Sequence, residues 1–128
     1  MLTRLLLIAV LASLAACSAP AASQPSATDT SPPEADLTVM LADFMIDPSD
    51  IEADGPMVTI EVTNDGPTPH NLTVRDATGA ALVATEDLSS GASEVITASL
   101  EPGTYTIFCS LAGHESLGMS ATLLVAAP

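Results

Sequence analysis

The chain has 128 residues, among which sixteen are acidic, two are basic (Arg4 and Arg75) and none is lysine. After subtraction of an N-terminal leader and a linker, this length leaves room for one domain of about 90 residues, and one functional site is the expected maximum. Once Arg4 leaves with the leader, one positive charge faces sixteen negative ones, which argues against a nucleic-acid partner and favours basic proteins. Adaptation of the host to salt would produce the same acidic composition, and the sequence leaves both explanations open.

The first sixteen residues have the pattern of an export signal. Arg4 precedes an apolar run from Leu5 to Ala16, which is too short to cross a bilayer and typical of a signal-peptide core. The run ends in Leu-Ala-Ala followed by Cys17, which resembles the bacterial lipobox. The resemblance implies cleavage before Cys17, lipidation of that cysteine and anchoring to a bacterial membrane outside the cytoplasm, in the periplasm or on the outer face. The alternative is an ordinary secreted protein that is cleaved nearby and carries Cys17 by chance.

Residues 17–35 comprise Cys17 and a segment rich in Ala, Ser, Thr and Pro that has no apolar periodicity. This composition predicts a disordered tether. Such a segment would span about 25 Å as a coil and about 55 Å as extended polyproline II. A domain on this tether could meet partners close to the membrane without entering it.

Residues 36–128 consist of short alternating segments separated by turn residues, which predicts an all-β domain. No segment is long and periodic enough for a crossover helix, so the expected fold is a single antiparallel Greek-key β-sandwich of about seven or eight strands. The expected strands are Leu37–Ala42, Met57–Asn64, Asn71–Asp76, Ala81–Thr85, Ser93–Leu100, Thr104–Cys109 and Met119–Val125.

Two groups of residues receive a purely structural interpretation. The three methionines of the first half of the domain are expected to pack in the fold, and they are Met40, Met45 and Met57. The acidic stretch after the first strand is expected to be solvated surface, and it contains Asp43, Asp47, Asp50, Glu52 and Asp54.

The rarest residues of the domain are the candidates for its chemistry. The domain contains two histidines, His70 and His114, and one cysteine, Cys109. Cys109, His114 and Met119 follow one another at intervals of five residues. A lone cysteine cannot form a disulfide within the domain, so a single thiol in an exported protein suggests another use for its sulfur.

Strand alternation places His70, Cys109 and Met119 on the core side of their strands. The apolar residues that share their parities are Leu72, Val74, Tyr105, Ile107, Ala121, Leu123 and Val125. These three side chains are therefore expected at one end of the sandwich, where His114 joins them from the loop between the last two strands. A thiolate, two imidazoles and a distant thioether form the ligand set of a blue-copper electron-transfer site, because the thiolate suits Cu(I) and imidazole suits both oxidation states.

Each of these residues also has a simpler interpretation. His70 in a Pro-rich turn could be a solvated loop residue, Met119 could be core packing, and a buried Cys109 could be an inert small hydrophobe. The four residues occupy the required order, parity and spacing, and they include every histidine and cysteine of the domain. Their combination therefore favours copper.

At these residues the sequence resembles the plastocyanin-like cupredoxins. Cys109, His114 and Met119 after Thr-Tyr-Thr-Ile-Phe, and His70 between Pro and Asn71, look like the two copper-binding segments of that family. The resemblance covers about residues 37 to 125, and it implies that His70, Cys109 and His114 are equatorial ligands of one copper ion and that Met119 is a weak axial ligand. It also implies that Asn71 joins the two ligand loops by hydrogen bonds near the thiolate. Four residues lie on each side of His114, which departs from the shorter first gap of plastocyanins and is nearer to the spacing in phytocyanins and rusticyanin. The phytocyanin disulfide is missing, so the subfamily stays open.

The predicted function is one-electron transfer without catalysis, because multicopper oxidases and nitrite reductases need further His-rich sites that this chain cannot build. The expected partners are redox proteins such as cytochromes or an oxidase or reductase, and the expected state is a monomer. Leu111 and Leu117 flank His114 and are expected to form the partner contact. The alternatives are a copper chaperone or storage lipoprotein, which would show exposed Met or His clusters, and a metal-free immunoglobulin-like adhesion module, which has no need for the ligand spacing.

Overall fold

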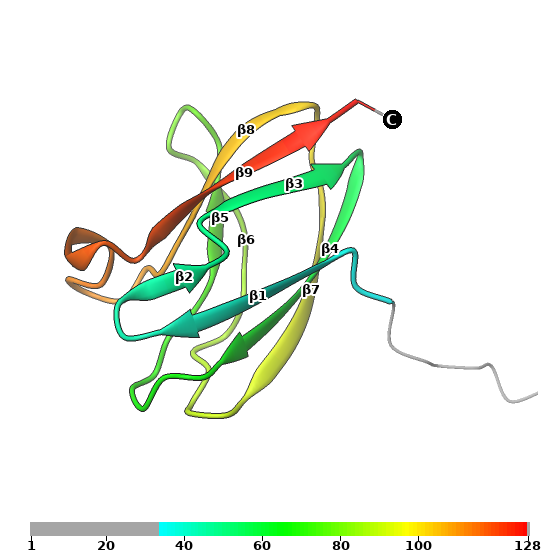
Figure 1. The fold of residues 1–128 in the computed structure, drawn as a ribbon. Coiled ribbons are helices and arrows are strands. Elements are labelled where there is room, and N and C mark those ends of the chain that lie inside the picture. The colour runs from blue at the N-terminus through cyan, green and yellow to red at the C-terminus, as the bar shows by residue number, and fades with distance from the viewer. Residues whose placement is uncertain (1–33, 128) are drawn as a thin grey trace, which may run out of the picture. The chain divides into compact units, whose positions relative to one another are not determined.

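The computed structural model describes residues 34–127, which form a sandwich of two β-sheets (Figure 1). The described part contains nine strands and one short 3-10 helix, η1 (Glu115–Leu117). The strands are β1 (Leu37–Ala42), β2 (Met45–Asp47), β3 (Asp50–Asp54), β4 (Met57–Asn64), β5 (Thr73–Arg75), β6 (Ala81–Ala84), β7 (Ser93–Ser99), β8 (Gly103–Phe108) and β9 (Ser120–Ala126). The all-β sandwich is therefore confirmed, with more strands than expected.

The two sheets are mixed, which corrects the prediction of a purely antiparallel sandwich. One sheet has the strand order β2-β1-β4-β7 and the other the order β3-β9-β8-β5-β6. β1 runs parallel to β4, and β3 runs parallel to β9. Parallel neighbours need a long connection, and here the intervening strands provide it: β2 and β3 lie between β1 and β4, and β4 to β8 lie between β3 and β9.

The segment 45–54 forms two strands that the sequence pattern does not predict. β2 belongs to one sheet and β3 to the other, so the chain changes sheets between them, at Pro48 and Ser49. The acidic residues of β3 point outward, as the solvated interpretation expected, while Ile51 and Ala53 alternate with them and are buried. Only two buried residues mark this strand, which makes its periodicity weak. Outward acids on an edge strand also discourage pairing with another chain.

The core lies between the sheets and consists of aliphatic side chains. In β4 the inward residues Val58, Ile60 and Val62 are buried, as their parity predicted. The predicted packing of the three methionines is wrong, because Met40, Met45 and Met57 are 42%, 56% and 56% exposed. Met40 has the outward parity of β1, between the buried Val39 and Leu41, so its side chain faces solvent.

The predicted signal peptide, Cys17 and nearly all of the predicted tether lie outside the described residues. Among the residues that are described, no helix has the length and apolar character needed to span a membrane.

Candidate metal centre

His70 lies in the connection between β4 and β5, and backbone hydrogen bonds fix its position. It pairs with Leu88 through two bonds, from the His70 amide to the Leu88 carbonyl at 3.1 Å and from the Leu88 amide to the His70 carbonyl at 2.7 Å. The side chain of His70 is 0% exposed. A buried imidazole must have partners for both ring nitrogens, and both have them, as described below.

The loop from Cys109 to Met119 joins β8 to β9 and carries the other three candidate ligands. The amide of Cys109 donates to the carbonyl of Met119 at 3.1 Å, and the amide of Met119 donates to the carbonyl of His114 at 3.1 Å. These bonds close the loop on itself and bring its two ends together. Cys109 and Met119 are fully buried, while His114 is partly exposed. In Figure 1 this loop, which contains η1, lies at the same end of the sandwich as the β1–β2 turn.

Three of the predicted ligands converge on one point. The Nδ1 atoms of His70 and His114 are 3.2 Å apart, and Sγ of Cys109 is 3.4 Å from Nδ1 of His114. All three ligand atoms lie within 4.8 Å of one another. Residues separated by 44 positions in the sequence thus direct their donor atoms at a common centre.

The donor set fits one copper ion. A single thiolate and two imidazole nitrogens suit both copper and zinc, but a buried methionine beside the cysteine favours copper, since thioethers are soft ligands and zinc sites use Cys, His and carboxylates. Met119 is such a residue, since it is fully buried and its carbonyl accepts from the amide of Cys109. The four residues lie near one another as in a type 1 copper site.

Asn71 connects the two ligand loops. Its backbone amide points at Sγ of Cys109 at 3.5 Å. Its side-chain oxygen accepts from the amide of Ser110 at 2.8 Å, and its side-chain nitrogen donates to Oγ of Ser110 and to Asp87, both at 2.9 Å. Asn71 therefore holds the segment after β8 against the segment that carries His70, where the resemblance placed it.

Asp43 also belongs to the site, which its local sequence does not indicate. Its Oδ1 lies 2.7 Å from Nε2 of His70 and accepts from Oγ1 of Thr68 at 2.6 Å. The hydrogen bond from Thr68, followed by that from His70, lowers the pKa of Asp43 below its ordinary value. Asp43 is exposed, as the solvated interpretation expected, but it also bonds to His70, and a contact 27 positions away in the sequence leaves no mark in the local pattern. Its place directly after the predicted first strand was the only local signal.

Arg75 and Glu115 form a second connection that the sequence did not indicate. The guanidinium of Arg75 reaches both carboxylate oxygens of Glu115, with Nη1 at 3.2 Å from Oε2 and Nη2 on Oε1. The guanidinium carbon also lies 4.3 Å from the ring centre of Phe108. Because Glu115 follows His114 directly, this ion pair ties the ligand loop to the outer face of the sheet.

Apolar residues lie near His114 in the fold. Leu117 is 62% exposed, while Leu111 is partly buried against the core. The ring of Phe44, itself part exposed, meets the ring of His114 edge-on with centroids 5.0 Å apart. The two leucines predicted for partner contact therefore lie in the same loop as His114, and Phe44 joins them from the β1–β2 turn.

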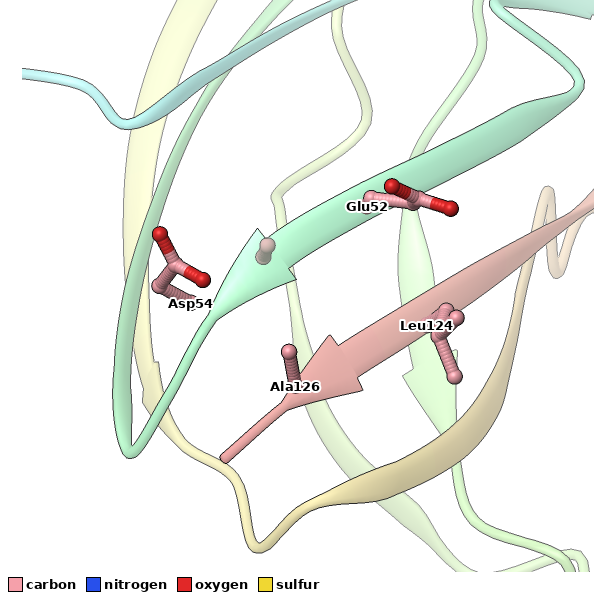
Figure 2. A pocket seen from close by; sticks show the side chains of 5 residues that line it. Glu52, Asp54, Leu124 and Ala126 are labelled. Carbon is pink, nitrogen blue, oxygen red and sulfur yellow. The ribbon is translucent and has the colours of Figure 1, made fainter. Parts of the chain in front are cut away.

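A separate pocket lies between β3 and β9 (Figure 2). It is lined by Glu52, Ala53, Asp54, Leu124 and Ala126. These residues lie toward the C-terminal ends of the two strands, whereas Met119 directly precedes the N-terminal end of β9. The pocket thus lies at the other end of β9 and contains none of the predicted site residues.

Comparison with known proteins agrees with this geometry. The family model described as a cupredoxin-like domain matches residues 5–125. Among curated proteins, no sequence matches significantly.

Several solved structures have the same fold. An auracyanin from the photosynthetic bacterium Roseiflexus castenholzii is 21% identical, with a TM-score of 0.62, over 70% of this chain and 95% of that one. An azurin from Methylomonas sp. strain J is 19% identical, with a TM-score of 0.61, over 69% of this chain and 95% of that one. A purple cupredoxin from Nitrosopumilus maritimus is 22% identical, with a TM-score of 0.57, over 71% of this chain and all of that one.

Proposed function

Because the chain belongs to the cupredoxin-like domain family, we propose that it is a one-electron carrier with a single type 1 copper site and no catalytic activity. In this proposal His70, Cys109 and His114 are the equatorial ligands and Met119 is the axial one. The observation that carries it is the convergence of three donor atoms within 4.8 Å at one end of the sandwich. Copper supplies the Cu(II)/Cu(I) couple, and the protein supplies a fixed set of donors.

The residues around the cluster favour rapid electron transfer because they hold the donors in place before any metal binds. Cys109 and Met119 are joined by a backbone bond, His70 is paired with Leu88, and Asn71 bridges the two loops. Donors held in this way cannot rearrange much between the two oxidation states, so little reorganisation accompanies each transfer.

We further propose that electrons enter and leave at the partly exposed edge of His114. Phe44 meets this imidazole edge-on, and Leu111 and the exposed Leu117 lie in the same loop. An apolar patch on a highly charged domain is a typical contact surface. The partners would be redox proteins such as cytochromes, or an oxidase or reductase. The excess of acidic residues would steer a basic partner toward the protein, and the domain would act as a monomer.

The place of the protein in the cell is also part of the proposal. Residues 1–16 would be a lipoprotein signal peptide, residues 17–35 a lipidated tether and residues 36–128 the copper domain, which would be held at the outer side of a bacterial membrane. Replacing Cys17 with Ala should move the protein from the membrane fraction to the soluble or uncleaved pool without changing its copper spectrum. An unchanged membrane fraction with no accumulated precursor would contradict lipidation.

A copper chaperone or storage protein is the second candidate, and exposed methionines favour it. Met40 and Met45 lie on the paired strands β1 and β2 and are 42% and 56% exposed, so thioethers are accessible on this surface. A chaperone should release Cu(I) to a competing chelator within minutes and lose this ability in a Met40→Leu, Met45→Leu variant. A carrier should retain its copper in both proteins.

The central experiment is addition of Cu(II) to the purified soluble domain, followed by absorption and electron paramagnetic resonance spectra. The wild type should bind one equivalent and show an intense thiolate charge-transfer band with small copper hyperfine splitting. Cys109→Ser should fold but lose the band, because serine supplies a harder oxygen that donates far less charge. A band that survives in Cys109→Ser would remove the thiolate from the site, and a wild type without the band would refute the type 1 assignment.

A further inference from the structure

The hydrogen bond between Nε2 of His70 and the carboxylate of Asp43 indicates a function for this acidic residue. We propose that Asp43 is the positioning residue of His70, which holds the buried imidazole as the tautomer protonated on Nε2 and leaves the Nδ1 lone pair for the metal. The proposal rests on the copper site proposed above and deepens it, because it names the group that orients one ligand and places a negative charge beside the cluster.

The geometry of the two ring nitrogens supports this assignment. Nε2 of His70 lies 2.7 Å from Oδ1 of Asp43, and Nδ1 faces Nδ1 of His114 at 3.2 Å. A carboxylate only accepts hydrogen bonds, so Nε2 must carry the proton that it receives. In a neutral ring the proton on Nε2 leaves Nδ1 as a free acceptor, which is the state a metal ligand needs.

Asp43 is itself fixed, so its carboxylate can impose an orientation on the imidazole. Its Oδ1 accepts a second hydrogen bond from Oγ1 of Thr68 at 2.6 Å, and that hydroxyl lies 3.3 Å from Nε2 of His70. Asp43 lies at the surface with 29% of its side chain exposed, whereas the side chain of His70 is 0% exposed. Asp43 also directly follows β1, whose Leu41 carbonyl accepts from the amides of Asp65 and Gly66.

Gly66 shows that the backbone makes room for this contact. A Cβ atom at position 66 would lie 2.9 Å from Oδ1 of Asp43 and 3.1 Å from Nε2 of His70. Any larger residue would therefore press on the very two atoms that form the hydrogen bond. The absence of a side chain at Gly66 lets the carboxylate reach the ring from the turn between β1 and β2.

A carboxylate at this position has two separable effects. It selects the tautomer and ring orientation through its hydrogen bond, which acts even without metal. It also places a negative charge near the cluster, which stabilises Cu(II) relative to Cu(I) and lowers the reduction potential. Asp43→Asn removes the charge but keeps a side-chain oxygen as acceptor, whereas Asp43→Ala removes both.

The experiment compares wild type, Asp43→Asn, Asp43→Ala and the control Asp65→Asn. Asp65 is an exposed acid in the neighbouring loop. It does not bond to the ring of His70, because Nδ1 of that ring faces His114 and Nε2 faces Asp43. In the metal-free proteins, nitrogen-15 NMR should show His70 protonated on Nε2 with slow proton exchange in wild type and Asp65→Asn. Asp43→Asn should exchange faster, and Asp43→Ala should exchange fastest and lose the single tautomer. In the copper-loaded proteins at fixed pH and salt, voltammetry should give higher potentials for both Asp43 variants than for Asp65→Asn.

Two results would overturn the assignment. An unchanged tautomer and exchange rate in Asp43→Ala would show that the fold orients His70 without the carboxylate. Potentials in the Asp43 variants that match that of Asp65→Asn would show that Asp43 acts only as one more surface charge. The NMR measurement needs no metal, so a wild type that fails to form a blue site would refute the proposed function while leaving the test of Asp43 intact.

Discussion

His70 illustrates how much a single residue of this protein depends on its neighbours. It is fully buried, and its two ring nitrogens face different partners, His114 on one side and Asp43 on the other. Cys109 is equally buried, and it is a free thiol with the amide of Asn71 directed at its sulfur. A buried polar atom without a partner would destabilise the fold, and among the described residues no buried side-chain nitrogen or oxygen lacks one. The site is therefore consistent with a stable fold as well as with metal binding.

The axial position gives a prediction at this scale. Met119→Gln should keep a copper site but lower its reduction potential, since an oxygen ligand that binds more strongly on the axis favours Cu(II) over Cu(I). Voltammetry of the copper-loaded protein measures the shift, and Met57→Gln is the control because Met57 is 56% exposed. A potential for Met119→Gln that is unchanged or higher would show that Met119 is not the axial ligand.

At the scale of elements, the connections between strands carry most of the specific polar contacts. The turn between β5 and β6 depends on Asp76, whose Oδ1 accepts from the amides of Thr78 and Ala80 at 2.8 and 3.0 Å and from the hydroxyl of Thr78 at 2.6 Å. Gly79 in this turn has φ of +88°, a conformation that favours glycine. The same strand, β5, ends at Arg75, which pairs with Glu115 in the ligand loop.

These contacts predict a pH-dependent stability of the turn. The hydrogen bond from the Thr78 hydroxyl, followed by that from the Ala80 amide, lowers the pKa of Asp76 below its ordinary value of 3.8. A carboxylate with a lowered pKa stabilises the fold above its unfolded-state pKa, and this contribution is lost as pH falls through the folded-state pKa. Asp76→Ala should therefore unfold at a lower temperature than wild type near pH 7, and the difference should shrink below pH 3.8.

Asp76→Asn is the matched control for the turn, because asparagine keeps the acceptor oxygen but does not titrate in this range. It should be more stable than Asp76→Ala at every pH and should lack the pH-dependent part of the wild-type stability. Thermal unfolding followed by circular dichroism between pH 2.5 and 7 measures both effects. A difference between wild type and Asp76→Ala that stays constant over this range would contradict the assigned cause.

At the scale of the whole molecule, the described part combines a strongly acidic composition with exposed apolar side chains near His114. Arg75 is the only lysine or arginine of the described part, and it is paired with Glu115. Within residues 34–127, the negative field of the carboxylates is thus opposed by no unpaired lysine or arginine. Leu117 and Leu111 lie in the same loop as His114, and the ring of Phe44 meets the imidazole edge-on. In the proposed function, long-range attraction of a basic partner and short-range contact at His114 would be separable contributions to electron exchange.

Leu117→Lys tests the short-range contribution. It should slow exchange with a small basic cytochrome by about fivefold, the factor that corresponds to about 1 kcal/mol of lost contact energy, and leave the copper spectrum unchanged. Leu124→Lys is the control, since it makes the same charge change on a leucine that is 43% exposed at the other end of β9. Stopped-flow rates should fall with salt in all three proteins. Equal rates for Leu117→Lys and Leu124→Lys would show that electrons do not pass at this edge of His114.

The sequence by itself determined the elements whose evidence is local. β1 and β4 have the predicted bounds, because alternation of apolar and polar residues records which side of a strand is buried. The cluster of His70, Cys109 and His114 was predictable for a related reason, since their rarity, parity and spacing are all properties of short segments. The signal peptide and tether stay predictions, because they lie outside the described residues.

Only the tertiary structure decided the features that depend on distant residues. The parallel pairings of β1 with β4 and of β3 with β9 arise from contacts across the sandwich, and nothing in either strand records its neighbour. The bond between Asp43 and His70 spans 27 positions, and the bond between Arg75 and Glu115 spans 40. An aspartate in a turn has the same local sequence whether it faces water or an imidazole. Its contacts depend on how distant segments pack, and in this fold the packing makes an exposed acid the hydrogen-bond partner of His70.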